Sequence, residues 1–210
     1  MNGDTLEHTP VLLNEVIRTI NPQSGKLYFD ATFGWGGYTK KLLDSCACEV
    51  IAIDQDPKVK SRAKEFKREY GTRFNFIESK FSEICSVLKK LNTKKVDGFM
   101  FDIGVSSMQL DNPQRGFSFN KKGPLDMRMG TSELTAEEFI NSVPEDELAD
   151  IIYNYGDERK SRRIAKLIVE HRKINPIKTT LHLADIILKA KPKKNNHKKH
   201  PVSYTHLRAH

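Results

Sequence analysis

A glycine-rich turn between an apolar run and a helix-compatible segment is the feature that most constrains this chain. The run at residues 28–30 ends in an acid, Gly34, Gly36 and Gly37 form the turn, and helix-compatible residues follow from Thr39. Glycine suits such a turn because it adopts backbone conformations closed to other residues and lets a ligand approach the main chain. A strand, a tight turn and a helix start are the layout of a loop that holds a nucleotide-type cofactor.

A second apolar run, at residues 50–54, ends in Asp54. An acid at the end of the second strand is where such folds hold the ribose hydroxyls of an adenosine. The spacing Gly34-x-Gly36-Gly37 differs from G-x-G-x-x-G, which disfavours a nicotinamide cofactor, and from G-x-x-x-x-G-K-[ST], which excludes a P-loop. S-adenosylmethionine is the favoured cofactor, and an ordinary turn without a ligand is the alternative.

Composition predicts a globular protein, since 38% of the 210 residues are hydrophobic and 30% are charged. The apolar runs are far shorter than the roughly 20 residues of a membrane span, and the N-terminus resembles neither a signal nor a transit peptide. Three cysteines without a framework spacing predict reduced thiols in a cytoplasmic protein, with Cys85 in the core, and no metal site. Much of the net charge of +8 comes from lysines after residue 188, which indicate a solvated end or contact with a phosphate backbone.

Strand and helix patterns alternate four times in the first half of the chain. The expected strands are residues 27–31, 50–54, 74–77 and 98–102. Alternation with helices predicts a parallel sheet with right-handed crossovers. Asp30, Asp54 and Asp102 end three of these strands, at the edge where parallel sheets bind ligands. Each acid alone is more often a helix cap or turn residue, but three at one edge favour a binding site.

After Asp102 the strand pattern stops. Residues 103–111 are small and polar and are expected to form a loop, followed by a long irregular but ordered stretch to residue 129. The sequence Thr135-x-x-Glu138 is a capping box, which predicts the start of a helix. Further helices are expected at residues 144–153, 157–173 and 180–188. This half of the chain is therefore predicted to be a helical subdomain.

Eight strings of residues, in order, carry a family likeness. They are HTPVL at 8–12, DATFGWGG at 30–37, DQDP at 54–57, DIGVSS at 102–107, RGFSF at 115–119, GPLDMRM at 123–129, and YGDE at 155–158 with SRRIA at 161–165. Together they resemble the bacterial 16S ribosomal RNA (cytosine-N4)-methyltransferase family, once called MraW. The RGFSF and GPLDMRM strings are the most specific, and the likeness covers about residues 6–201.

The resemblance implies an α/β protein of the class I methyltransferase fold, a Rossmann-like parallel sheet with an inserted α-helical substrate domain. It also implies S-adenosyl-L-methionine as methyl donor and a cytosine in the decoding region of 16S rRNA, in the small ribosomal subunit, as target. Carried over position by position, the cofactor contacts would be Gly36, Gly37, Tyr38, Asp54, Phe81, Asp102 and Gln109. Tyr38 replaces the family's commoner histidine, so a backbone contact is expected there.

An exocyclic amine needs placement and a proton acceptor rather than a covalent nucleophile. Asp102, Ser106 and Ser107, after the fourth strand, are therefore the candidate catalytic residues, and no cysteine lies there to support C5 methylation. Basic and aromatic side chains that could grip RNA and stack on a base are Arg115, Phe117, Phe119, Arg128, Arg162 and Arg163. The alternative for the arginines is ion pairing with Asp126, Asp157 and Glu158.

The expected domains are residues 1–111, a cofactor-binding half domain; 112–190, an inserted RNA-recognition domain; 191–201, a basic linker; and 202–210, a non-native tail. The tail is expected because the residues after His200-Pro201 match nothing in the family, which indicates a parent truncated at its C-terminus. A non-catalytic RNA-binding fragment is the alternative function, and a nicotinamide-dependent oxidoreductase is less favoured. The sequence predicts no membrane partner and leaves the oligomeric state open.

Overall fold

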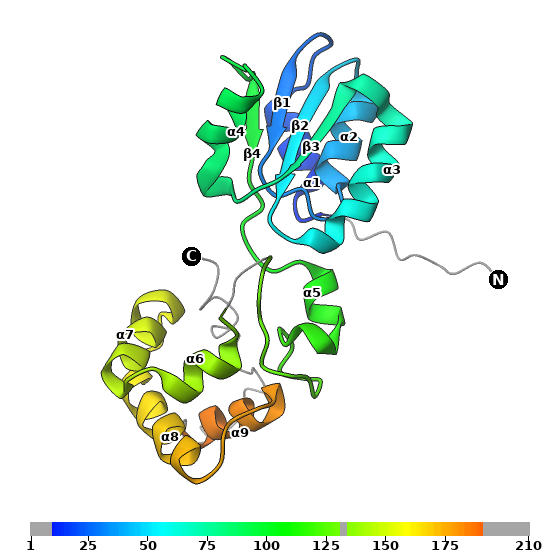
Figure 1. Cartoon of the computed structure of the whole chain (residues 1–210). Coiled ribbons are helices and arrows are strands. Elements are labelled where there is room, and N and C mark those ends of the chain that lie inside the picture. Colours follow the sequence, from blue (N-terminus) through cyan, green and yellow to red (C-terminus); the bar gives the residue numbers. More distant parts are fainter. Residues whose placement is uncertain (1–9, 131–133, 191–210) are drawn as a thin grey trace, which may run out of the picture. The chain divides into compact units, whose positions relative to one another are not determined.

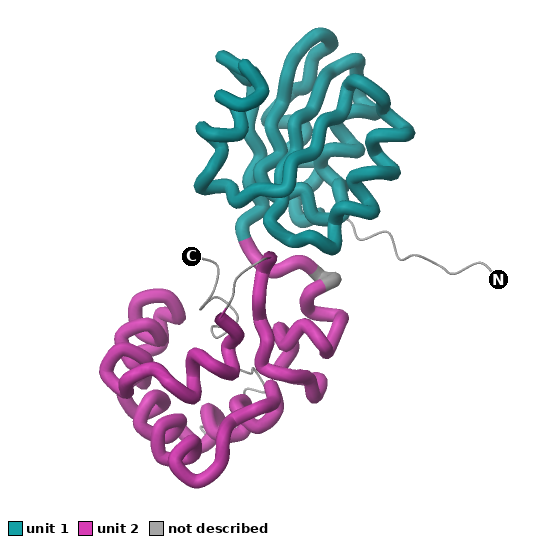
Figure 2. Tube along the Cα trace, viewed as in Figure 1, with its two compact units in different colours: residues 1–103 teal, residues 104–210 magenta. Residues whose placement is uncertain are grey.

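The computed structural model describes residues 10–130 and 134–190. The chain divides into two compact units, residues 1–103 and 104–210 (Figure 2). The expected boundary after residue 111 falls inside the second unit, and the expected linker and tail lie outside the described residues. Among the helices that the structure describes, none is long and apolar enough to cross a membrane.

The first unit alternates helices and strands around a four-stranded sheet (Figure 1). Its elements are α1 (Leu13–Ile20), β1 (Leu27–Asp30), α2 (Gly37–Ser45), β2 (Glu49–Asp54), α3 (Lys60–Tyr70), β3 (Phe74–Glu78), α4 (Ile84–Lys90) and β4 (Gly98–Met100). All strand pairs are parallel, in the order β3-β2-β1-β4. The predicted α/β class and parallel sheet are confirmed, and the strand order reverses between β1 and β4, where such sheets bind ligands.

The central strands β1 and β2 are buried on both faces, as in parallel sheets generally, while the edge strands β3 and β4 are partly exposed. On one face Phe29, Ile51 and Ile53 pack with Val87 of α4. On the other side, where Figure 1 shows α2 and α3, the ring of Phe33 lies 5.2–5.5 Å from three further phenylalanine rings. These cores fix the strands whose ends carry the predicted site.

Two expectations for the first unit are wrong in detail. Strand β4 ends at Met100, so Asp102 lies two residues beyond the strand rather than at its last position. Cys85 was expected in the core but is exposed. Helix α4 turns Ile84, Val87 and Leu88 toward the sheet, and at about 100° per residue the position after Ile84 turns away from that face.

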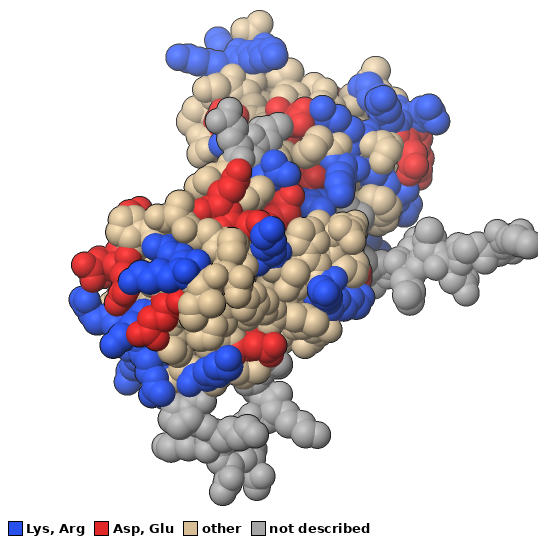
Figure 3. All heavy atoms as spheres, turned by 60° about the horizontal axis from the view of Figure 1, so that its bottom comes forward, with Lys and Arg blue, Asp and Glu red and all other residues tan. Residues whose placement is uncertain are grey.

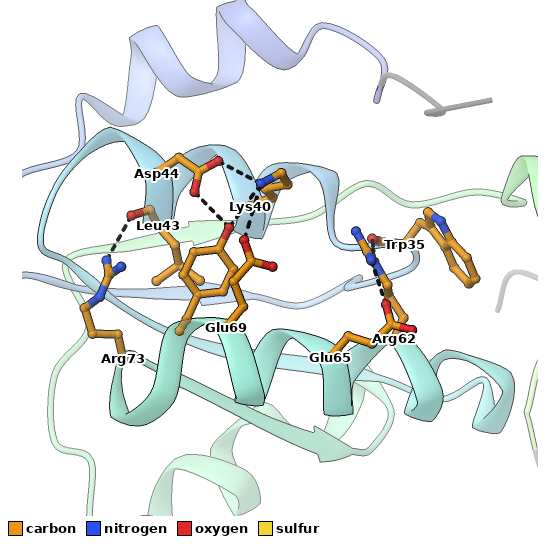
Figure 4. A network of polar contacts seen from close by, with 9 residues as sticks. Trp35, Lys40, Leu43, Asp44, Arg62, Glu65, Glu69 and Arg73 are labelled. Atoms are coloured by element: carbon orange, nitrogen blue, oxygen red, sulfur yellow. Dashed lines mark hydrogen bonds and ion pairs between the residues drawn. The ribbon is translucent and has the colours of Figure 1, made fainter. Parts of the chain in front are cut away.

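Polar contacts hold α2, α3 and the glycine turn together (Figure 4). Lys40 of α2 lies 3.0 Å from Asp44 and 3.7 Å from Glu69 of α3. Arg62 of α3 donates to the carbonyl oxygen of Trp35 at 3.3 Å, and its guanidinium lies 5.9 Å from the Trp35 ring. The turn is therefore anchored from α3 as well as by its own backbone.

The second unit is helical in the residues described. Its helices are α5 (Ser107–Asp111), α6 (Ala136–Ser142), α7 (Glu145–Gly156), α8 (Ser161–Ile174) and α9 (Thr180–Ala190), with a 3-10 turn at Pro113–Arg115. Apolar side chains of the last four helices form one core. The capping box at Thr135 and Glu138 is confirmed, with both reciprocal hydrogen bonds present.

Helices α5 and α8 differ from the sequence expectations. Residues 107–111 form α5 rather than a loop. Helix α8 begins at Ser161 instead of residue 157 because Asp157 has a φ of 48°, a left-handed conformation that ends α7. The predicted order of the stretch before α6 is confirmed: the Thr180 hydroxyl donates to the Lys121 carbonyl at 2.8 Å and accepts from the Gly123 N–H at 3.1 Å.

Candidate functional site at the strand ends

Three acidic residues lie at the same edge of the sheet, as the sequence predicts. Asp30 ends β1 and Asp54 ends β2, while Asp102 follows β4, the neighbour of β1 on its other side. Because the carboxyl ends of parallel strands lie at one edge, the three carboxyl groups belong to the same end of the sheet. The carboxylates of Asp54 and Asp102 both act electrostatically on Asp30, which supports this grouping.

Asp30 is the fully buried member of the group, with 0% of its surface exposed. One carboxyl oxygen accepts from the Thr39 hydroxyl at 2.6 Å and the other from the Thr32 N–H at 3.1 Å. Burial raises the pKa of Asp30 from 3.8 to about 6, against the lowering effect of these two hydrogen bonds. The sequence placed Asp30 at a strand end but not among the site residues; its position in the DATFGWGG string was the available signal.

Thr32 connects Asp30 to Asp102. The Thr32 N–H donates to Asp30, and the Thr32 hydroxyl oxygen accepts from the Asp102 N–H at 2.8 Å. The backbone of Asp102 is thus tied to the end of β1, while the residue itself is exposed. An exposed carboxylate on a fixed backbone is suited to accepting a proton or hydrogen bond from a bound molecule.

Tyr38 has a side-chain role that the sequence did not predict. Its ring is buried, its hydroxyl donates to the Val11 carbonyl, and the carboxylate of Asp102 lies within hydrogen-bonding reach. Burial raises the pKa of Tyr38 to about 12, with the negative charges of Asp102 and Asp30 acting in the same direction. The phenol is therefore a neutral donor at this edge, whatever contact its backbone makes.

Asp54 is oriented by the main chain around it. One carboxyl oxygen accepts from the Gly34 N–H and the other from the Asp56 N–H, both at 2.8 Å. Burial raises its pKa, and these hydrogen bonds oppose that effect. The Gln55 N–H also interacts with this carboxylate. A carboxylate has about four acceptor sites, so capacity remains for a ribose hydroxyl. The residue fits the adenosine role that the sequence predicts.

The glycines of the turn are required by packing as well as by conformation. Gly36 has a φ of 80°, and a Cβ there would lie 2.5 Å from the ring of Phe66. A Cβ on Gly37 would collide with the Pro10 ring. No side chain caps the N-terminus of α2, so the first-turn amides behind these glycines are suited to a negative group of a ligand.

The remaining cofactor candidates are divided between the units. Phe81 is an exposed ring in a 3-10 turn that follows β3, the neighbour of β2. Gln109 and Ser106 belong to the second unit: the Gln109 side chain accepts from the Ser106 N–H at 2.9 Å, and the Ser106 hydroxyl accepts from the Gln109 N–H. These bonds stabilise the start of α5, and the roles of Ser106, Ser107 and Gln109 beside Asp102 stay predictions.

The RNA candidates separate into structural and exposed residues. Arg128 forms a two-point contact with Asp126, at 2.8 and 2.7 Å, which lowers the pKa of Asp126. Arg115 is buried, donates to the Arg128 carbonyl at 2.9 Å and lies over the Phe117 ring. Phe117 is 1% exposed, so it cannot stack on a base in this conformation, and packing is the role that the structure gives it.

Phe119 is half-buried, and its contact with RNA stays a prediction. Arg162 and Arg163 are exposed on α8, and neither side chain pairs with Asp157, Glu158 or another described residue. The ion-pair alternative therefore accounts for Arg128 but not for these two arginines. The described residues also contain no group of three or more His, Cys, Asp or Glu side chains placed to hold a metal ion.

The parallel sheet, its helices and the glycine turn define an α/β protein of the class I methyltransferase fold. The chain belongs to the MraW methylase family, whose sequence profile matches residues 5–207 and so extends into the stretch expected to be foreign. It is 57% identical over 180 residues to "Ribosomal RNA small subunit methyltransferase H" of Rickettsia canadensis, and 54% and 53% identical to the proteins of that name from Rickettsia massiliae and Rickettsia africae. Each match covers 86% of this chain and 58% of the relative, so the chain spans less than two thirds of their length.

Proposed function

We propose that this chain carries the cofactor-binding part of an S-adenosylmethionine-dependent methyltransferase that acts on the N4 amine of a cytosine in 16S rRNA. The observation that carries the proposal is Asp54, a carboxylate at the end of β2 that main-chain N–H groups orient and that retains acceptor capacity for a ribose hydroxyl. The name of the relatives supports ribosomal RNA of the small subunit as the target. Such a target implies work in the cytoplasm.

The acids at the strand ends suit a cationic cofactor. Asp30, Asp54 and Asp102 place three carboxyl groups at one edge, and the ion pairs among the described residues include none of them. A negative edge favours a positive ligand group, and S-adenosylmethionine supplies an electrophilic methyl group on a sulfonium. Asp54 would hold the ribose, Phe81 would offer a ring to the adenine, and the amides behind Gly36 and Gly37 would face the carboxylate of the methionine part.

Asp102 is the residue best suited to the reacting amine. The cytosine N4 lone pair is delocalised into the ring, so in-line placement and acceptors for the N4 protons are what the protein must provide. The Asp102 backbone is fixed through Thr32 and its carboxylate is exposed. In the proposal this carboxylate accepts a hydrogen bond from N4, orients the amine and then takes up its proton.

Methyl transfer to isolated small ribosomal subunits tests the proposal. The chain is incubated with radiolabelled S-adenosylmethionine and subunits from a strain that lacks the endogenous modification, and the RNA is digested to nucleosides. Label in N4-methylcytidine, lost in Asp102→Asn, is the expected result. Label at C5, or in another nucleoside, would refute the assigned chemistry. RNA binding without cofactor binding would favour the non-catalytic RNA-binding alternative.

A further inference from the structure

Helix α8 has two chemically distinct faces. Its apolar side, with Ile164, Ala165 and Ile168, is buried in the core of the second unit. Its other side carries exposed charged residues, which are Arg162, Arg163, Lys166, Glu170 and Lys173. At about 100° per residue these positions share one face of the helix. This face of α8 therefore carries four basic side chains and one acidic side chain, and the opposite face is packed in the core.

The cations of this face have no partner among residues 10–130 and 134–190. Among the residues that the structure describes, the side chains of Arg162, Arg163, Lys166 and Lys173 form no hydrogen bond or ion pair. Arg172, one residue from Lys173, shows the contrast: it donates to the Ile140 carbonyl at 2.6 Å and so has a structural role. Unpaired guanidinium and ammonium groups are available to a ligand without breaking an internal contact.

The neighbouring helix has the opposite charge. Helix α7 contains Glu145, Asp146, Glu147 and Asp150, all exposed or nearly so, and no basic residue. Helices α7 and α8 pack together, yet no ion pair between their described residues joins these charges. Figure 3 shows Lys and Arg side chains next to Asp and Glu side chains on the face that it displays. The exposed charges of α8 are therefore mainly positive and attract a polyanion, whereas those of α7 are negative.

We propose that the basic face of α8, defined as Arg162, Arg163, Lys166 and Lys173, binds the sugar-phosphate backbone of a single-stranded RNA segment. From Arg162 to Lys173 the helix rises about 16 Å, which matches roughly five nucleotides of a stacked strand. Contacts of this kind position a nucleic acid without reading its sequence. The inference rests on the proposed function because it requires an RNA substrate. In it, α8 orients the RNA and takes no part in the methyl transfer itself.

The test compares two double variants that each remove two exposed, unpaired cations from a helix. One is Arg163→Gln with Lys166→Gln on α8, and the matched control is Arg68→Gln with Lys64→Gln on α3. Binding of a fluorescein-labelled 12-nucleotide single-stranded RNA is measured by anisotropy at several salt concentrations. Circular dichroism and thermal unfolding show whether each variant keeps its fold.

The expected result is a smaller salt dependence for the α8 variant only. Each lost phosphate contact lowers the slope of log affinity against log salt by about 0.7 for a single strand, so two contacts give about 1.4. An unchanged slope, or an equal fall in the α3 control, would overturn the α8 assignment. If the unaltered chain does not bind this RNA, the α8 assignment fails. Methyl transfer to small ribosomal subunits then still decides the proposed function separately.

Discussion

Replacing Asp30 by asparagine should stabilise the first unit and reveal the energetic cost of a buried carboxylate. Asp30 is 0% exposed and its pKa is raised from 3.8 to about 6. A group whose folded-state pKa is raised makes the folded state less stable as pH rises from the unfolded pKa through the folded one. With an unfolded-state pKa of 3.8 and a folded-state pKa of about 6, the ionisation of Asp30 costs no folding stability well below pH 3.8. Above pH 6 it lowers the free energy of unfolding by about 3 kcal/mol.

In Asp30→Asn the new side chain would retain an acceptor for the Thr32 N–H, and its amide could donate to the Thr39 hydroxyl, which must then reverse its role. The pKa of about 6 already includes the hydrogen bonds to the ionised carboxylate. The difference in free energy between the protonated carboxyl and the asparagine amide does not depend on pH, so the comparison between two pH values isolates the ionisation. The stabilisation by Asp30→Asn should be about 2 kcal/mol larger at about pH 8 than at about pH 4.5.

Urea unfolding followed by the fluorescence of Trp35, the single tryptophan, measures this for the first unit. Asp97→Asn is the matched control, because hydrogen bonds from the Leu27 N–H and Lys26 lower the pKa of Asp97. Its effect has the opposite sign: Asp97 contributes stability above its unfolded pKa, so the variant is destabilised at about pH 8 and less so at low pH. An Asp30→Asn effect that is equal at both pH values would refute the reasoning.

Local geometry gives three further predictions. Gly36→Ala should lower the free energy of unfolding in urea by about 2–4 kcal/mol, because it combines a positive φ with a ring collision. Gly25→Ala, with a φ of 74° and no atom within 4 Å of the added Cβ, should lower it by only about 1 kcal/mol. Equal losses in the two variants would contradict the packing argument. Thr135→Ala should cost about 1 kcal/mol by removing a capping box, and Thr135→Ser should restore most of it. A thiol reagent should modify exposed Cys85 quickly and Cys48 only on unfolding. Burial removes access to the Cys48 thiol and raises its pKa to about 12. Rapid reaction of Cys48 in the folded protein would contradict the described core.

The sequence was sufficient for the strand ends because their signals are local. Apolar runs that end in Asp30 and Asp54, and a turn built on Gly36, specify a strand, a turn and a helix without any long-range information. The positive φ of Gly36 and the orientation of Asp54 by the Gly34 amide agree with that interpretation. Local backbone requirements are therefore the part of this fold that is accessible from the residues alone.

Burial and pairing were not accessible in the same way. Phe117 and Arg115 suggested an RNA surface by residue type, but contacts with residues farther along the chain place both in the interior. Cys85 was assigned to the core because its helix is apolar, and one step of helix rotation exposes it. Tyr38 gained a buried hydroxyl contact with the Val11 carbonyl, 27 residues earlier. Each of these outcomes depends on partners that the local sequence does not specify.

Calorimetric titration of S-adenosylmethionine into this chain tests the central claim most directly, because it asks whether the strand ends hold the cofactor. The account predicts saturable binding, a loss of about 10-fold or more in Asp54→Asn through weakened bonds to the ribose, and unchanged binding in Glu49→Gln, which alters the opposite end of β2. Absence of binding by the unaltered chain, or equal affinity in Asp54→Asn, would contradict it.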